Sequence, residues 1–280
     1  MRSLEKFAAT EPRVPAFAGK ATGICVSRCL LAVAALLGAS APAAGAGLAL
    51  VLAVDVSASV TADSYLLQRD GIARAFENPR LGNAISAVPG GIEALVLEWS
   101  DPDRIAVTVG WTRLADKTSA ADFAAAVRET RRSSEGLTAI GPALLAAAAA
   151  FDHTPEPATR RIIDISGDGM ANFGLPPAVA RDRIVATGIT INGLAILTEE
   201  PWLEAYYRSN VIGGPGAFVV AARDFRSFAD AILRKLAQEI AEAERSDAVG
   251  PDRFEAVEAD RGIARRVGAG RQDLDLVAHP

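Results

Sequence analysis

Cysteine is nearly absent from this sequence, which has only Cys25 and Cys29 among 280 residues. Both lie in an N-terminal segment that we expect to be removed on export, so the mature chain would contain no thiol. It would then have neither a disulfide nor a cysteine ligand for zinc. We therefore expect a domain that is stabilised by its hydrophobic core alone.

Histidine is equally scarce, with only His153 and His279. A serine hydrolase needs a base beside its nucleophile. His153 follows a predicted helix, which places it at the opposite end of the predicted sheet from the candidate serines, and His279 lies in the C-terminal tail. The sequence also lacks a Gly-x-Ser-x-Gly elbow and a Gly-x-x-x-x-Gly-Lys phosphate loop. These absences disfavour a serine hydrolase and a phosphate-loop enzyme.

The sequence has no basic patch. Its net charge is −5, and because residues 1–46 carry a net +3, residues 47–280 carry −8. An acidic domain of this kind is repelled by phosphate backbones. We therefore expect no nucleic acid among its partners.

Long hydrophobic runs are also missing. The apolar stretch 29–37 is too short to span a bilayer comfortably, and it is followed by small residues with Ala-x-Ala sites that end at Ala41 and Ala46. We interpret residues 1–46 as a signal peptide with an extended N-region, and expect an exported protein, periplasmic or secreted, with no stable membrane span after cleavage. A permanent anchor is the alternative interpretation.

What the sequence does have is a regular alternation of predicted strands and helices. Half of its residues are hydrophobic, and no composition shift marks a second domain. This pattern predicts an α/β fold, a doubly wound, mostly parallel six-stranded sheet with one antiparallel strand and helices on both faces. The antiparallel strand follows from the short link between strands 92–99 and 104–110. We expect the domain to span residues 47–244 and a disordered tail to span 245–280.

The stretch 48–59 places polar side chains at the end of an apolar strand. The run ends at Asp55, and Ser57 and Ser59 follow at alternate positions. The carboxyl ends of parallel strands are where open α/β sheets bind ligands. The alternative is that the serines cap a helix that begins near Ala62.

Two later segments complete a recognisable pattern. Thr138 lies in a Gly-x-Thr-x-x-Gly sequence before a helix, and Asp168 follows an apolar strand. Together with the Asp-x-Ser-x-Ser sequence, they resemble the von Willebrand factor type A domain over residues 48–244. The later sequence, including Tyr206-Tyr207, is similar to an exported bacterial branch of that superfamily whose function is uncharacterised. One departure is Gly167, because many relatives have threonine at this position.

The resemblance implies a metal-ion-dependent adhesion site. Its ligands would be Asp55, Ser57, Ser59, Thr138 and Asp168, with the hydroxyls bound directly and the aspartates partly through water. Independently of the resemblance, carboxylate and hydroxyl oxygens without His or Cys favour a hard divalent cation, with Mg²⁺ first and Mn²⁺ or Ca²⁺ as alternatives.

The expected function is a non-enzymatic binding or adhesion module that engages an acidic protein, or another carboxylate-bearing ligand, through the cation. A metal-dependent hydrolase or phosphatase, or a structural scaffold with a vestigial metal site, are the alternatives. We further expect four residues near the site to form a rim that meets the partner. These are Trp99, Asp101, Glu199 and Trp202.

Overall fold

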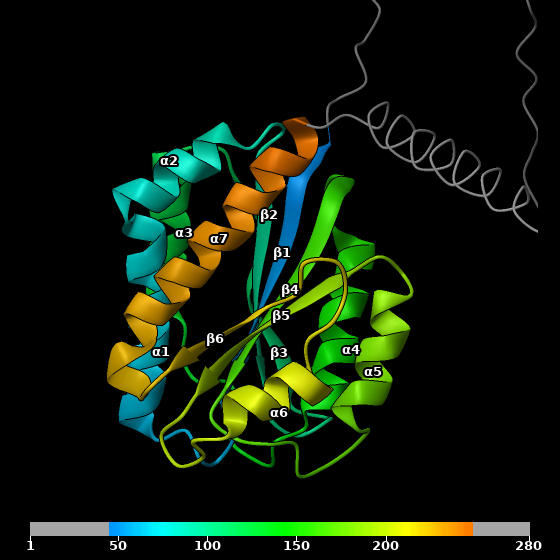
Figure 1. Ribbon diagram of the computed structural model, residues 1–280. Helices are drawn as coiled ribbons and strands as arrows, with labels where there is room; N and C mark the ends of the chain where they lie inside the picture. Colours follow the sequence, from blue (N-terminus) through cyan, green and yellow to red (C-terminus); the bar gives the residue numbers. More distant parts are fainter. Residues whose placement is uncertain (1–44, 249–280) are drawn as a thin grey trace, which may run out of the picture. The chain divides into compact units, whose positions relative to one another are not determined.

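The computed structural model describes residues 45–248, which form one mixed sheet covered by helices on both faces (Figure 1). The strands are β1 Ala46–Asp55, β2 Ile92–Trp99, β3 Ile105–Leu114, β4 Ala158–Gly167, β5 Thr190–Ile196 and β6 Val219–Ala222. The helices are α1 Ala62–Glu77, α2 Pro79–Ala87, α3 Lys117–Glu129, α4 Ile140–Ala150, α5 Pro177–Val185, α6 Leu203–Asn210 and α7 Phe228–Ala248, with short 3₁₀ turns at Phe151–His153 and Phe225–Ser227.

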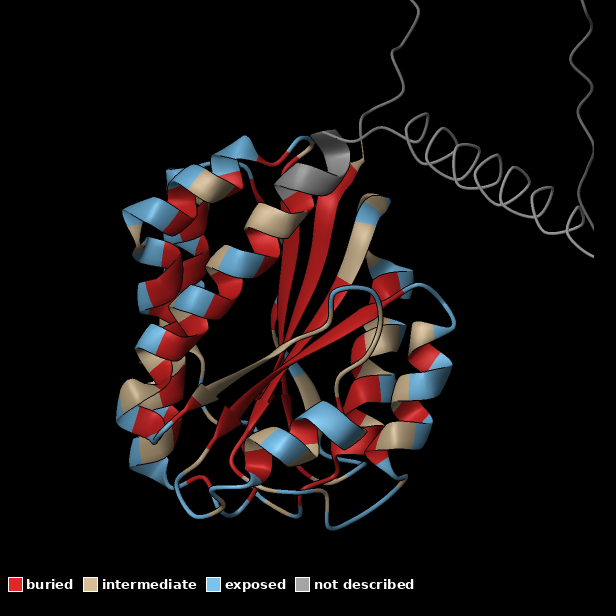
Figure 2. Ribbon diagram, viewed as in Figure 1, coloured by how far each residue is buried: buried red, intermediate tan, exposed pale blue. Residues whose placement is uncertain are grey.

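The strand order is β3-β2-β1-β4-β5-β6. Neighbouring strands are parallel except β2 and β3, which are antiparallel. The predicted fold class is therefore confirmed, including the antiparallel strand that the short link after β2 requires. β1 lies near the centre of the sheet and every one of its residues is buried (Figure 2), because strands covered on both faces need a nearly continuous apolar run.

Two hydrophobic cores cover the two faces of the sheet. Leu48, Leu50 and Leu52 of β1 pack with α1, α2, α3 and α7, whereas the alternating residues Ala49 and Val51 pack with α4, α5 and α6. This division follows from the two-residue period of a strand, which points successive side chains to opposite faces. Figure 1 shows the two helical layers on either side of the strands.

Helix α1 is capped by Thr61, whose hydroxyl accepts a hydrogen bond from the Ser64 backbone at 3.1 Å. The hypothesis that Ser57 and Ser59 cap this helix is therefore wrong, because both serines come before the cap residue. Their hydroxyls take part instead in contacts at the strand end.

A charge cluster is buried between α7 and the sheet. The Lys235 ammonium lies 2.7 Å from Asp164 of β4 and 2.6 Å from Glu239, and all three side chains are almost completely buried. Asn192 of β5 donates a further hydrogen bond to Glu239 at 2.7 Å. Two carboxylates thus share one cation, and burial raises both of their pKa values, that of Glu239 to about 7.

The domain limits differ slightly from the expected ones. β1 begins at Ala46, and α7 continues through Ala248, four residues into the segment expected to be disordered. The predicted signal peptide, except for its last two residues, and residues 249–280 lie outside the described residues. Within residues 45–248, no helix is both long and apolar enough to cross a membrane.

Candidate functional site

The ends of β1 and β4 lie side by side and carry the two predicted aspartates. Asp55 is the last residue of β1, and Asp168 directly follows β4. The register pairs Val54 with Ser166, so both strands end at the same level. Residues 113 positions apart in the sequence thus meet at the carboxyl edge of the sheet.

Four of the five predicted residues are joined by hydrogen bonds. The Ser57 backbone donates to Oδ1 of Asp55 at 2.7 Å. The Ser57 and Ser59 hydroxyl oxygens are 3.2 Å apart, and Ser59 donates to Oδ1 of Asp168 at 2.7 Å. The structure therefore brings Asp55, Ser57, Ser59 and Asp168 together, as the spacing predicts for an Asp-x-Ser-x-Ser sequence at a strand end.

Thr138 belongs to the same group of loops but is linked to it through the backbone. Its N–H donates to the Asn172 side chain at 2.9 Å, and the Gly136 carbonyl accepts from Ala58, between the two serines, at 2.8 Å. In the part of the chain that the structure describes, no hydrogen bond joins the Thr138 hydroxyl to the other four residues. Thr138 is buried, and its loop packs directly against the serine loop.

Burial makes both aspartates weaker acids than usual. The pKa of Asp55 is raised to about 7, first because the carboxyl is fully buried and also because of the negative charge of Asp168. The pKa of Asp168 is also raised, chiefly by burial. Hydrogen bonds with Ser57 and Ser59 oppose these shifts. The inner oxygen of Asp55, Oδ2, is buried without a hydrogen-bond partner among the described residues.

Arg132 holds the serine loop in place, and sequence reasoning missed it. Its guanidinium donates to the carbonyl oxygens of Val56 at 2.8 Å and Ser57 at 2.9 Å. The next residue, Ser133, donates its backbone N–H to the buried carboxylate of Glu98 at 2.7 Å. An arginine in a polar loop carries no local signal for this role, because the contact depends on two segments about 75 residues apart.

The expected rim is partly wrong. Trp99 is completely buried in the core beneath α4, so it cannot contact a partner. Asp101 is engaged within the protein, since its carboxylate accepts from the Leu137 backbone at 2.8 Å and lies 3.5 Å from Arg104. Glu199 is exposed, and Trp202 is 48% exposed, as a rim requires.

Exposed hydrophobic side chains gather on the loops at this edge. We call them the apolar rim: Leu137, Met170, Phe173 and Trp202, which are 41–52% exposed. They lie before α4, after β4 and at the start of α6, which are the loops around the carboxyl ends of the parallel strands. Figure 2 shows that exposed and intermediate residues predominate on these loops. Several exposed hydrophobic side chains thus lie on the loops at the edge of the sheet that carries the candidate site.

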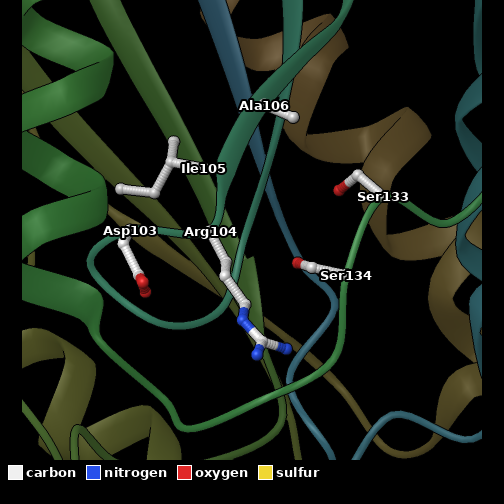
Figure 3. A pocket seen from close by; sticks show the side chains of 6 residues that line it. All are labelled: Asp103, Arg104, Ile105, Ala106, Ser133 and Ser134. Carbon is white, nitrogen blue, oxygen red and sulfur yellow. The ribbon is translucent and has the colours of Figure 1, made fainter.

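A separate hollow of about 380 Å³ lies near the turn between β2 and β3 (Figure 3). Its lining includes Arg104, Ser133 and Ser134, with none of the five predicted ligands. Arg104 already donates to the Glu135 carbonyl at 2.8 Å, and Ser134 is hydrogen-bonded to Ser100 at 2.9 Å. These polar groups are thus used in holding the loop together.

The described residues contain no group of three or more His, Cys, Asp and Glu side chains arranged to hold a metal ion. The candidate site has two carboxylates and relies on hydroxyls for its remaining oxygens. His153 is exposed and follows α4, so it lies at the end of the sheet away from Ser57 and Ser59, as expected. It cannot serve either serine as a base.

The strand order and the helices on both faces of the sheet are those of the von Willebrand factor type A fold. A family model described as "Protein of unknown function (DUF1194)" matches residues 46–244, and the chain belongs to this family. The match covers the whole of the sheet and all the helices except the last four residues of α7. Among curated proteins, nothing matches the chain.

Solved structures share this fold at low sequence identity. Proximal thread matrix protein 1 from the mussel byssus has a TM-score of 0.55 and 16% identity, over 70% of this chain and 48% of that one. A second structure of that protein, with a zinc-occupied MIDAS motif, has a TM-score of 0.51 and 19% identity, over 71% and 46% of the two chains. The von Willebrand factor domain of the pilus tip protein Mfa5 from Porphyromonas gingivalis has a TM-score of 0.50 and 10% identity, over 70% and 96%. The chain thus spans about half of the mussel protein.

Proposed function

We propose that the strand-end cluster binds a divalent cation and, through it, an acidic group on a protein partner. The proposed ligands are Asp55, Ser57, Ser59, Thr138 and Asp168. All are hard oxygen donors, which favour Mg²⁺, with Mn²⁺ and Ca²⁺ as alternatives. The zinc-occupied motif in the mussel structure supports a divalent cation in a domain of this fold.

The observation that carries the proposal is Oδ2 of Asp55. This buried oxygen has no hydrogen-bond partner among the described residues, although its carboxyl is fully buried beside a second acid. A buried polar atom without a partner is costly, and in native proteins a bound water or ion is one of the features that account for it. A bound cation would supply the positive charge that stabilises both carboxylates in their ionised form.

The surroundings favour a protein partner. The apolar rim offers hydrophobic contact area around the cluster, which a small carboxylate would not need. Residues 47–280 carry a net charge of −8, so an acidic partner is repelled unless a cation lies between the two. The N-terminal segment leads us to propose that the protein acts after export, in the periplasm or outside the cell.

Calorimetric titration of Mg²⁺ and of Mn²⁺ into the purified full-length chain tests the cation site. We expect saturable binding that is lost in Asp55→Ala and in the closely isosteric Asp55→Asn, with circular dichroism as the check that both variants are folded. Binding that persists in both folded variants would contradict the proposed ligand set. No binding by the folded wild type would favour a structural scaffold with a vestigial site.

Phosphatase activity has a direct test of its own. Such an enzyme would usually need a second carboxylate at position 57 and a nearby lysine, but the chain has Ser57, and Lys235 is buried with Asp164 on the α7 side of the sheet. We therefore expect no hydrolysis of a generic phosphate ester in the presence of Mg²⁺. Turnover that disappears in Asp55→Asn would overturn the binding-module proposal.

A further inference from the structure

Two buried oxygen atoms without partners face the same small space above Gly167. One is Oδ2 of Asp55 and the other is the hydroxyl of Tyr207, and both lack a hydrogen-bond partner among the described residues. A Cβ atom at position 167 would lie 2.7 Å from each of these oxygens. Only glycine allows both to come so close to the end of β4.

A second glycine makes room for the tyrosine ring. Tyr207 lies on α6, is completely buried, and passes so close to Gly193 of β5 that a Cβ atom there would lie 2.8 Å from its Cδ1. The glycines on the adjacent strands β4 and β5 thus leave room for the Tyr207 ring to extend from α6 to the end of β1. Figure 1 shows α6 close to the strand ends that carry the cluster.

The helix that carries Tyr207 is fastened to the same loops. The hydroxyl of its neighbour Tyr206 accepts a hydrogen bond from the Ala171 backbone at 3.2 Å, three residues after Asp168. Tyr206 also packs against Trp202 of the apolar rim, with ring centroids 6.4 Å apart. The hydrogen bond from Ala171 thus fixes α6, which carries Tyr207, against the loop that follows Asp168.

An unpaired donor opposite an unpaired acceptor suggests a hydrogen bond that forms in one state of the protein. We propose that Tyr207 is a positioning residue of the cation site: its hydroxyl donates to Oδ2 of Asp55 when a cation is bound, and so holds the carboxylate in its binding orientation. This inference rests on the proposed cation site. The Tyr207 hydroxyl lies in the space that a side chain at position 167 would otherwise fill.

The first test compares Tyr207→Phe with Tyr206→Phe, which each remove one hydroxyl from α6. Mn²⁺ affinity is measured by calorimetry on the full-length chain. We expect Tyr207→Phe to weaken binding by about tenfold or more, as loss of a residue that orients a metal ligand does. Tyr206→Phe removes the acceptor of the Ala171 backbone N–H and leaves the Tyr207 hydroxyl in place, so it should weaken binding less than Tyr207→Phe does.

Thermal unfolding of the metal-free protein separates positioning from packing. Because the Tyr207 hydroxyl has no partner there, its removal should leave the melting temperature unchanged or raise it. A lower melting temperature with unchanged Mn²⁺ affinity would show a structural role and overturn the inference.

A rescue experiment asks whether the hydroxyl itself matters. Gly167→Ser and Gly167→Ala are each combined with Tyr207→Phe, so both double variants carry the same added Cβ and only one adds a hydroxyl beside Asp55. We expect the serine variant to bind Mn²⁺ more tightly than the alanine variant.

The outcomes distinguish this inference from the proposed function. Wild-type binding that Tyr207→Phe leaves intact overturns the role of Tyr207 alone and leaves the cation site standing. Equal affinities of the two double variants, where both still bind Mn²⁺, also count against the hydroxyl. Absence of Mn²⁺ binding by the wild type overturns both proposals together.

Discussion

Ser59 donates a hydrogen bond to Oδ1 of Asp168 at 2.7 Å, which joins two residues 109 positions apart. This contact ties the loop after β1 to the loop after β4, and it orients one predicted ligand by means of another. Neither loop contains a regular element of its own at this point. The geometry of the cluster therefore depends on side-chain contacts between strands that the sheet has already aligned.

Ser59→Ala should weaken Mn²⁺ binding by about tenfold or more, because it removes a proposed ligand and the partner that orients Asp168. Thr61→Ala is the matched control two residues away. It should cost about 1 kcal/mol of unfolding free energy through loss of the α1 cap, with little change in affinity. Calorimetry and urea denaturation on both variants test the pair. Equal affinity losses would indicate that the loop, and not the Ser59 hydroxyl, determines binding.

Lys235→Met should destabilise the protein by about 3–5 kcal/mol, because it leaves Asp164 and Glu239 buried without their shared cation. Lys117→Met provides the comparison, since Lys117 is exposed at the start of α3 and should change the free energy of unfolding by no more than about 0.5 kcal/mol. Urea denaturation at pH 7 measures both. A small effect of Lys235→Met would mean that the carboxyls are already neutral at that pH.

The metal-free protein should be more stable at pH 5 than at pH 8. Burial raises the pKa of Glu239 from 4.5 to about 7 in the folded state, so the folded protein holds a proton that the unfolded chain has lost. The resulting stabilisation is present below the unfolded pKa of 4.5 and is lost as the pH rises through about 7.

Glu239→Gln tests this assignment by urea denaturation at the two pH values. We expect a smaller difference between pH 5 and pH 8 in the variant than in the wild type. The raised pKa values of Asp55 and Asp164 act in the same direction, so part of the slope should remain. If the difference in unfolding free energy between pH 5 and pH 8 is unchanged in the variant, the pH dependence comes from those other carboxyls.

Trp99→Ala and Trp202→Ala should differ sharply in stability. Trp99 is completely buried, so its truncation should cost about 3–5 kcal/mol. Trp202 is 48% exposed, and its truncation should cost less than about 1 kcal/mol, which leaves a folded protein for partner-binding experiments. Chemical denaturation of the two variants checks this contrast. A large loss of stability in Trp202→Ala would show that Trp202 is part of the packed domain and does not belong to the apolar rim.

The sheet could be predicted because its signals are local. Continuous apolar runs mark the buried strands, and the short link at 100–104 leaves β3 no parallel arrangement. Helix starts are harder to predict where side-chain caps decide them. Helix α3 begins at Lys117 because Asp116 and Ser119 form a capping box.

The contacts around the cluster could not be predicted in the same way. Trp99 ends a strand, and the sequence does not show whether such a side chain points into the core or toward the loops. Tyr207 and Arg132 reach the cluster only through the packing of α6 and of the loop before α4. Asp101 looked like a solvent-facing acid but shapes the Gly136–Leu137 turn. These contacts join segments that are far apart in the sequence, and the hydrophobic periodicity of one segment does not predict them.

The hydrogen bonds from Arg132 to the Val56 and Ser57 carbonyls affect the kinetics of cation binding. A loop that is already ordered by folding loses less conformational entropy when a ligand arrives. Cation exchange should then be a local event, fast in both directions, that needs no rearrangement of the backbone.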